Sequence, residues 1–163
     1  MTIRLITLLA LGLAAPAWAG QAPTSPSPAA TFKEECASCH VPYPAKLLPA
    51  ESWRAVMAGL KSHFGVNASL DAPTASVIER FLVANASMRP ARSTAPGVGP
   101  VIRITETAWF AKEHREVPAR RWTSAEVKSK ANCSACHVGA ERGNFEDGMS
   151  GSGGGSGSGA GRR

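Results

Sequence analysis

The clearest apolar stripe in the sequence recurs at steps of three and four residues and predicts a helix that begins near Ala50 and ends at Gly65. Its members are Trp53, Val56, Met57, Leu60 and Phe64. His63 lies on the edge of this stripe, so we expect its side chain to point toward the core. A second helix is predicted from Asp71, an N-cap residue with a proline in the following turn, to about Asn85.

Two capping boxes, each a threonine followed three residues later by a glutamate, stand before the two cysteine pairs of the chain. The box at Thr31 to Glu34 predicts a short helix that leads to Cys36. The box at Thr123 to Glu126 predicts a helix that runs through Ala131 into Cys133. Both pairs are therefore expected to follow a capped helix.

The remaining segments divide the chain. Three prolines exclude a regular helix from residues 41–49, and prolines and glycines mark a loop or linker at residues 89–100. Residues 101–104 are predicted to form a short strand. A helix that starts at Thr105 is expected to end at Pro118. Such a chain is mainly α, with long irregular loops and two parts joined at the linker.

The two cysteine pairs carry the chemistry. Cys36-Ala37-Ser38-Cys39-His40 recurs as Cys133-Ser134-Ala135-Cys136-His137, and this is the c-type haem attachment signature. Cysteines three apart in a helical turn share a face, so Cys36 and Cys39 can add to two vinyl groups of one porphyrin, as can Cys133 and Cys136. The histidine that follows each pair, His40 or His137, then reaches the iron. The sequence therefore predicts two covalently bound haem c groups.

A single motif of this kind also fits a thiol redox pair or half of a zinc site. Four cysteines in an exported chain also suggest two disulfides. The regular spacing, with a histidine after each pair and no other cysteine in the chain, favours thioether bonds to haem.

The two ends are set apart by composition. Residues 1–19 resemble a signal peptide, with Arg4 before an apolar run and a small-x-small site that predicts cleavage after about Ala19. An uncleaved anchor is the alternative, although the run is short. Residues 20–30 are rich in Pro, Ser and Ala and are expected to be a disordered leader, and residues 148–163 a flexible Gly/Ser tail. Export and haem attachment together predict the periplasm, with no stable membrane insertion once the signal peptide is removed.

The charge of the chain argues against nucleic acid as a partner. The formal net charge is +6, but Arg4 leaves with the signal peptide and the haem propionates lower the charge further. Apart from two arginine pairs, the basic residues are scattered rather than clustered. We therefore expect protein partners for a mildly basic holoprotein.

Two histidines remain for the open axial positions of the irons. His63 lies 23 residues after His40, and His114 lies 23 residues before His137. This favours bis-His ligation, with His40 and His63 at one iron and His114 and His137 at the other, although crossed pairs would use the same residues.

Methionine is the rival ligand. Met57 is expected to belong to the core and Met88 lies in a loop that could supply a ligand; a Met/His pair would raise the potential that two imidazoles keep low.

With these residues identified, the chain resembles the bacterial dihaem cytochrome c family whose members donate electrons to small oxygen-binding monohaem cytochromes c. The resemblance rests on short segments in order between Thr31 and Asp147. They are residues 36–40, 43–44, 47–49, 52–53, 63–68, 70–71, 103–105, 109–110, 113–114, 131–137 and 143–145. His63 and His114 match the two non-motif histidines of the family, and the tail after Asp147 departs from the family pattern.

The resemblance implies two small haem-binding lobes with bis-His iron in both. The first, residues 31–92, should be similar to class I cytochromes c, and the second, residues 93–147, less regular. It further implies a membrane cytochrome b as electron donor and a monohaem cytochrome c as acceptor. The aromatic residues near the motifs are expected to pack around the porphyrins rather than relay electrons.

The sequence thus predicts a periplasmic electron carrier through two low-potential haems, without substrate chemistry of its own, because no residue stands out as an acid, base or nucleophile. The main alternative is a dihaem enzyme of the peroxidase or reductase type, which needs one open iron site. A haem-free disulfide or zinc protein is the other.

Overall fold

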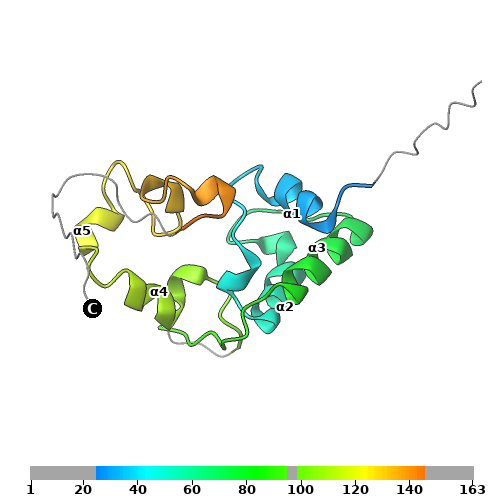
Figure 1. Ribbon diagram of the computed structural model, residues 1–163, viewed down its shortest axis with the longest axis horizontal. Helices are drawn as coiled ribbons and strands as arrows, with labels where there is room; N and C mark the ends of the chain where they lie inside the picture. The colour runs from blue at the N-terminus through cyan, green and yellow to red at the C-terminus, as the bar shows by residue number, and fades with distance from the viewer. Residues whose placement is uncertain (1–24, 95–98, 146–163) are drawn as a thin grey trace, which may run out of the picture.

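The computed structural model describes residues 25–94 and 99–145, and within these ranges the chain is mainly α-helical and contains no strand. The α-helices are α1 (Pro28–Cys36), α2 (Ala50–Ala58), α3 (Ala72–Ala84), α4 (Ala108–Glu113) and α5 (Ala119–Trp122). Short 3₁₀ turns connect them: η1 (Ala45–Leu47), η2 (Leu60–Ser62), η3 (Ile104–Glu106), η4 (Cys133–Ala135) and η5 (Ala140–Arg142). Figure 1 shows α1, α2 and α3 gathered at one end of the molecule, and α4 and α5 at the other.

The main apolar core lies where α1 and α2 pack against α3. Its buried members are Phe32, Ala45, Leu48, Trp53, Ile78 and Leu82. Each large apolar side chain removed from water here contributes about 1.5–3 kcal/mol. The indole N–H of Trp53 donates to the carbonyl of Ala45 at 2.7 Å, so the one polar atom of that ring is satisfied. Met57 packs against this core, as predicted.

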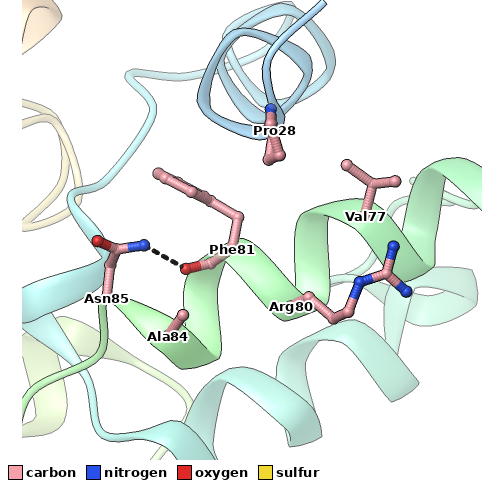
Figure 2. A pocket seen from close by; sticks show the side chains of 6 residues that line it. All are labelled: Pro28, Val77, Arg80, Phe81, Ala84 and Asn85. Atoms are coloured by element: carbon pink, nitrogen blue, oxygen red, sulfur yellow. Dashed lines mark hydrogen bonds between the residues drawn. The ribbon is translucent and has the colours of Figure 1, made fainter.

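Helix α3 confirms its sequence prediction at both ends. The Asp71 carboxylate accepts the backbone N–H of Thr74 at 3.0 Å, and Asn85 ends the helix by donating its side-chain amide to the carbonyl of Phe81 at 2.8 Å. Figure 2 shows this bond and the Phe81 ring, which points from α3 toward α1. The depression beside it, of about 340 Å³, contains neither cysteine nor histidine in its lining and so is separate from the haem motifs.

Helix α1 begins earlier than predicted. Ser27 is its N-cap and accepts the N–H of Ala30 at 3.2 Å, and the helix starts at Pro28. Proline at the first helical position has its φ already set for a helix, so this start prevails over the capping box at Thr31. Residues 28–30, which the composition assigned to a disordered leader, are therefore the first turn of α1. Residues 1–24, including the predicted signal peptide, lie outside the described residues.

Helix α2 ends earlier than predicted. Gly59 caps the helix after Ala58, because glycine has a low helix propensity, and the chain continues as η2. Phe64 (φ 48°) and Gly65 (φ 101°) then make a turn rather than a helix end. His63 consequently lies at the end of η2 and not on the face of α2.

The segment after the linker contains no strand at residues 101–104. Residues 92–94 instead run beside residues 106–108, through bonds from Thr94 N–H to the Glu106 carbonyl at 2.8 Å and from Ala108 N–H to the Arg92 carbonyl at 2.7 Å. Residues 89–94, 99 and 100 form no helix or strand, as predicted, while 95–98 lie outside the described residues. Thr107 is the N-cap of α4, so the predicted helix exists, but it begins three residues later than predicted, at Ala108, and ends at Glu113, before Pro118.

The helix predicted from Thr123 to Cys133 is absent. Thr123 is instead the C-cap of α5, and the chain turns at Lys128, whose φ of 65° no helix permits. The Asn132 side chain donates to the Val127 carbonyl at 3.0 Å, a bond that competes with helical pairing. The second motif therefore follows a series of turns, and only the first follows a capped helix. The tail after residue 145 lies outside the described residues.

Within the described ranges, no helix has the length and apolar character needed to cross a bilayer.

Candidate functional site

The first motif begins at the end of α1, and its histidine lies near the residue that ends η2. Cys36 is the last residue of α1, and the Nδ1–H of His40 donates to the Val41 carbonyl at 2.7 Å, which leaves Nε2 to face a metal. His63, the C-cap of η2, lies close to His40. The centroids of the two imidazole rings lie 6.1 Å apart, with an angle of 23° between the ring planes.

The second motif is built by shorter elements. Cys133 opens the turn η4, and the backbone N–H of His137 closes the loop on the Cys133 carbonyl at 2.8 Å. His114 is the C-cap of α4, where its ring stacks on Phe110 at 4.0 Å and its Nδ1–H donates to the Phe110 carbonyl at 2.9 Å. The His114 and His137 ring centroids are again 6.1 Å apart, but their planes make an angle of 82°.

Both ring separations fit an iron between two imidazoles. A bond from metal to imidazole nitrogen is about 2 Å long, and the ring centroid lies about 1 Å beyond that nitrogen, so two axial imidazoles should have centroids about 6 Å apart. Each pair meets this requirement. Of the pairings that the sequence left open, the structure brings together His40 with His63 and His114 with His137.

A cavity of about 1350 Å³ lies beside the first pair of imidazoles. Apolar core residues, Leu48 and Ile78 among them, line part of its wall, and the first motif with His63 lines another part. Residues of the second lobe, including Cys133, complete it. A large, mostly apolar cavity beside paired cysteines and imidazoles suits a flat porphyrin. Because residues of both attachment motifs line this cavity, the two motifs lie near each other.

The electrostatics of the cysteines do not favour a thiol redox pair. Burial, with a smaller contribution from Glu35, raises the pKa of Cys36 to about 11. Burial also raises the pKa of Cys133. Reactive redox cysteines have lowered pKa values, because the thiolate is the nucleophile. Neither thiol is activated in this way, and all four cysteines are unpaired.

The imidazole of His63 is held neutral, which is the form that binds a metal. Its pKa is lowered, first by burial and then by the neighbouring His40 and Arg103. The Arg103 guanidinium lies 4.2 Å from the centre of the Phe64 ring and forms an ion pair with Glu106 at 3.5 Å. The sequence alone provides no reason to assign Arg103 a role at this site. Arg103 lies 40 residues after His63, and its position near that histidine depends on the path of the chain between them.

The chain is similar to known dihaem cytochromes c. The family model described as dihaem cytochrome c matches residues 32–145. A crystal structure of DHC purified from Rhodobacter sphaeroides is 45% identical, with 69% of this chain and 93% of that chain covered and a TM-score of 0.58. The diheme cytochrome type c of Shewanella baltica OS155 is 42% identical, with 73% and 88% covered and a TM-score of 0.62. The comparison with curated proteins found no match.

The family match spans most of the chain and includes both attachment motifs and all four histidines. The structural matches share the mainly helical fold. The chain therefore belongs to the dihaem cytochrome c family, which implies two haem c groups, and the pairs Cys36 and Cys39, and Cys133 and Cys136, are present for their covalent attachment.

Proposed function

We propose that both irons are closed by two imidazoles, His40 with His63 in the first lobe and His114 with His137 in the second. The separation of 6.1 Å between the ring centroids in each pair is the observation that carries this proposal. The hydrogen bonds from His40 and His114 to backbone carbonyls support it, because a bonded Nδ1–H leaves Nε2 free as the ligand.

Methionine ligation has less support. The Met88 side chain is 98% exposed and does not line the cavity beside the first motif. Met57 does line that cavity, but it packs against the apolar core. Two imidazoles at each iron keep the reduction potential below that of a His/Met haem, so we infer a low-potential carrier.

A dihaem cytochrome c transfers electrons and has redox proteins as partners. The haem supplies the one-electron exchange, and the chain supplies axial ligands, burial and orientation. We infer that this chain performs no substrate chemistry, since two protein ligands at each iron leave no position for an exogenous one. A peroxidase or reductase would need such a position.

We further propose that the protein works in the periplasm, after removal of residues 1–19. A membrane cytochrome b is the proposed donor and a small oxygen-binding monohaem cytochrome c the proposed acceptor. The cysteine motifs support this location, because haem is attached to c-type cytochromes after the apoprotein is exported. Electron transfer to such partners suits a small, transient interface.

The ring geometry provides the test. Nearly parallel axial imidazoles give a rhombic low-spin electron paramagnetic resonance spectrum, whereas nearly perpendicular ones give a strongly anisotropic signal with a large maximum g value. The angles of 23° and 82° therefore predict two distinguishable signals in the oxidised protein. His63→Ala should remove the rhombic signal alone and His114→Ala the anisotropic one alone. A low-spin signal that survives both substitutions would refute bis-His ligation.

Carbon monoxide separates carrier from enzyme. We expect no spectral change when it is added to the reduced wild-type protein, and binding to half of the haem in each alanine variant. A shift of about half the haem in the wild type would support an open iron site and the enzyme instead.

A further inference from the structure

Tyr43, the single tyrosine of the chain, lies between the two attachment motifs. Its ring stacks on that of His40, with centroids 4.9 Å apart and an angle of 20° between the planes. Its hydroxyl donates to the carbonyl of Ala131 at 2.9 Å, a contact between residues 88 positions apart in the sequence. One side chain thus contacts an axial histidine of one lobe and the backbone of the other.

The Ala131 carbonyl also connects this bond to the second motif. Cys133 follows two residues later, and its sulfur lies 3.6 Å from the same carbonyl oxygen. Tyr43 therefore approaches the attachment point of the second haem as well as the ligand of the first.

Pro44, the residue after Tyr43, makes a second contact, with the segment that follows the second motif. Pro44 lies against the turn that ends η5, because a Cβ placed on Gly143 would be 3.7 Å from its Cγ atom. The pair Tyr43-Pro44 thus touches the second lobe both before and after the motif at residues 133–137.

The first imidazole is held in two directions by these neighbours. The bond from His40 Nδ1–H to the Val41 carbonyl fixes the ring edge, and the Tyr43 ring covers its face. The plane of His40, and with it the angle to His63, therefore depends on the ring of Tyr43, whereas the tie to the second motif depends on its hydroxyl.

We propose that Tyr43 is a positioning residue that couples the two haem sites: its ring sets the plane of His40 and its hydroxyl fixes the second attachment motif against the first. The proposal rests on the proposed role of His40 as an axial ligand. It assigns no oxidation or deprotonation to Tyr43 itself.

Two substitutions separate the ring from the hydroxyl in the holoprotein. Tyr43→Phe keeps the stack on His40 and removes the bond to Ala131, so the first-lobe paramagnetic resonance signal should keep its g values. Electron exchange between the haems, followed after flash reduction of part of the haem, should slow several-fold, because tunnelling weakens steeply with distance and with gaps in the contact path. Tyr43→Leu should slow the exchange and also shift the g values of the first signal. Thr123→Val, at an exposed threonine whose hydroxyl makes one long bond of 3.4 Å, to the Arg120 carbonyl, is the control and should alter neither.

Unchanged exchange in Tyr43→Phe, once corrected for any shift of the two potentials, would overturn the role of the hydroxyl. An unshifted first signal in Tyr43→Leu would overturn the role of the ring. Failure of bis-His ligation is a different result, since it would already be visible in the wild-type spectrum and in the histidine variants.

A measurement without substitution guards against loss of folding. With one tyrosine in the chain, 3-fluorotyrosine labelling gives a single ¹⁹F resonance. We expect a large paramagnetic shift of this resonance on oxidation, because the ring lies against His40. A resonance near that of the free amino acid in both oxidation states would overturn the proposal.

Discussion

Replacement of Thr107 by valine tests how the second lobe holds its distal ligand. Thr107 is fully buried, and its hydroxyl forms two bonds: it accepts the Phe110 N–H at 3.2 Å and donates to the Ile104 carbonyl at 2.7 Å. The first bond caps α4, the helix whose C-cap is His114. Valine has nearly the same shape, so Thr107→Val removes both bonds and leaves no cavity.

The expected cost follows from these two bonds. Loss of an N-cap hydroxyl costs typically about 1 kcal/mol. The Ile104 carbonyl keeps the backbone N–H of Thr107 at 3.2 Å, so loss of its bond from the hydroxyl costs about 0.5–1.5 kcal/mol. We therefore expect Thr107→Val to lower the free energy of unfolding by about 1.5–2.5 kcal/mol, a large share of the 5–15 kcal/mol typical of a domain. Because the loss falls at the start of α4, the position of His114 should loosen while that of His63 should not.

Chemical unfolding of the oxidised holoprotein measures the first effect, and paramagnetic resonance the second. A high-spin fraction should appear at the expense of the anisotropic signal alone. Thr107→Ser, which keeps the hydroxyl, and Thr123→Val, at an exposed threonine with one weak bond of 3.4 Å, are the controls and should stay near the wild type. A Thr107→Val protein as stable as Thr107→Ser, with an unchanged spectrum, would refute this reasoning.

Other perturbations follow from the same contacts. Trp53→Phe removes the indole bond to the Ala45 carbonyl, which keeps only the long bond of 3.4 Å from the Leu48 N–H, and should lower the free energy of unfolding by about 0.5–1.5 kcal/mol in denaturant titrations. The Asp71 carboxylate caps α3, and the hydrogen bonds from Thr74 lower the pKa of this carboxyl group. The cap therefore contributes its full stability at pH values above the ordinary aspartate pKa. This stability is lost as the pH falls through the lowered pKa of Asp71 in the folded protein. Asp71→Asn should therefore match the wild type at neutral pH but lose less stability on acid titration. Gly139→Ala would bring a Cβ within 2.8 Å of the Asn144 Cβ, and should destabilise the turn after His137 by about 1–3 kcal/mol. A melting temperature equal to that of the wild type would contradict this prediction.

The fold of the first lobe was largely predictable, because its helices carry local signals. Asp71 and the apolar residues of α3 define that helix at both ends. Where two signals compete, local rules gave the wrong answer: Ser27 with Pro28 prevailed over the capping box at Thr31, and Gly59 ended α2 before its apolar stripe did.

The second lobe was less predictable, because its backbone is paired by side chains and distant segments. The sequence from Thr123 to Glu126 matches a capping box, yet the Asn132 side chain donates to the Val127 carbonyl and Lys128 adopts a left-handed conformation. Neither this hydrogen bond nor this backbone conformation produces a periodic pattern in the sequence. The predicted strand at residues 101–104 failed for the same reason, since residues 92–94 pair with the segment after it.

The candidate site was predictable in its residues but not in its geometry. The repeated motif identifies four cysteines and two histidines, and counting leaves His63 and His114 as partners. The choice between pairs within a lobe and crossed pairs requires distances, as does the difference between 23° and 82°. The bridge from Tyr43 to Ala131 joins residues 88 positions apart and has no sequence signal at all.

The two haem sites therefore depend on different physical supports. The first lies against an apolar core made by three helices, so its histidines are placed by a fold that buries its own hydrophobic face. The second is framed by α4 and α5, of six and four residues, which are too short to be stable as isolated helices. Such a lobe gains its stability from the covalent haem, from the capping hydroxyl of Thr107 and from its contacts with Tyr43-Pro44 of the first lobe. The contact of Tyr43 and Pro44 with the second lobe, which we propose to couple the two haem sites, therefore also stabilises the backbone of that lobe.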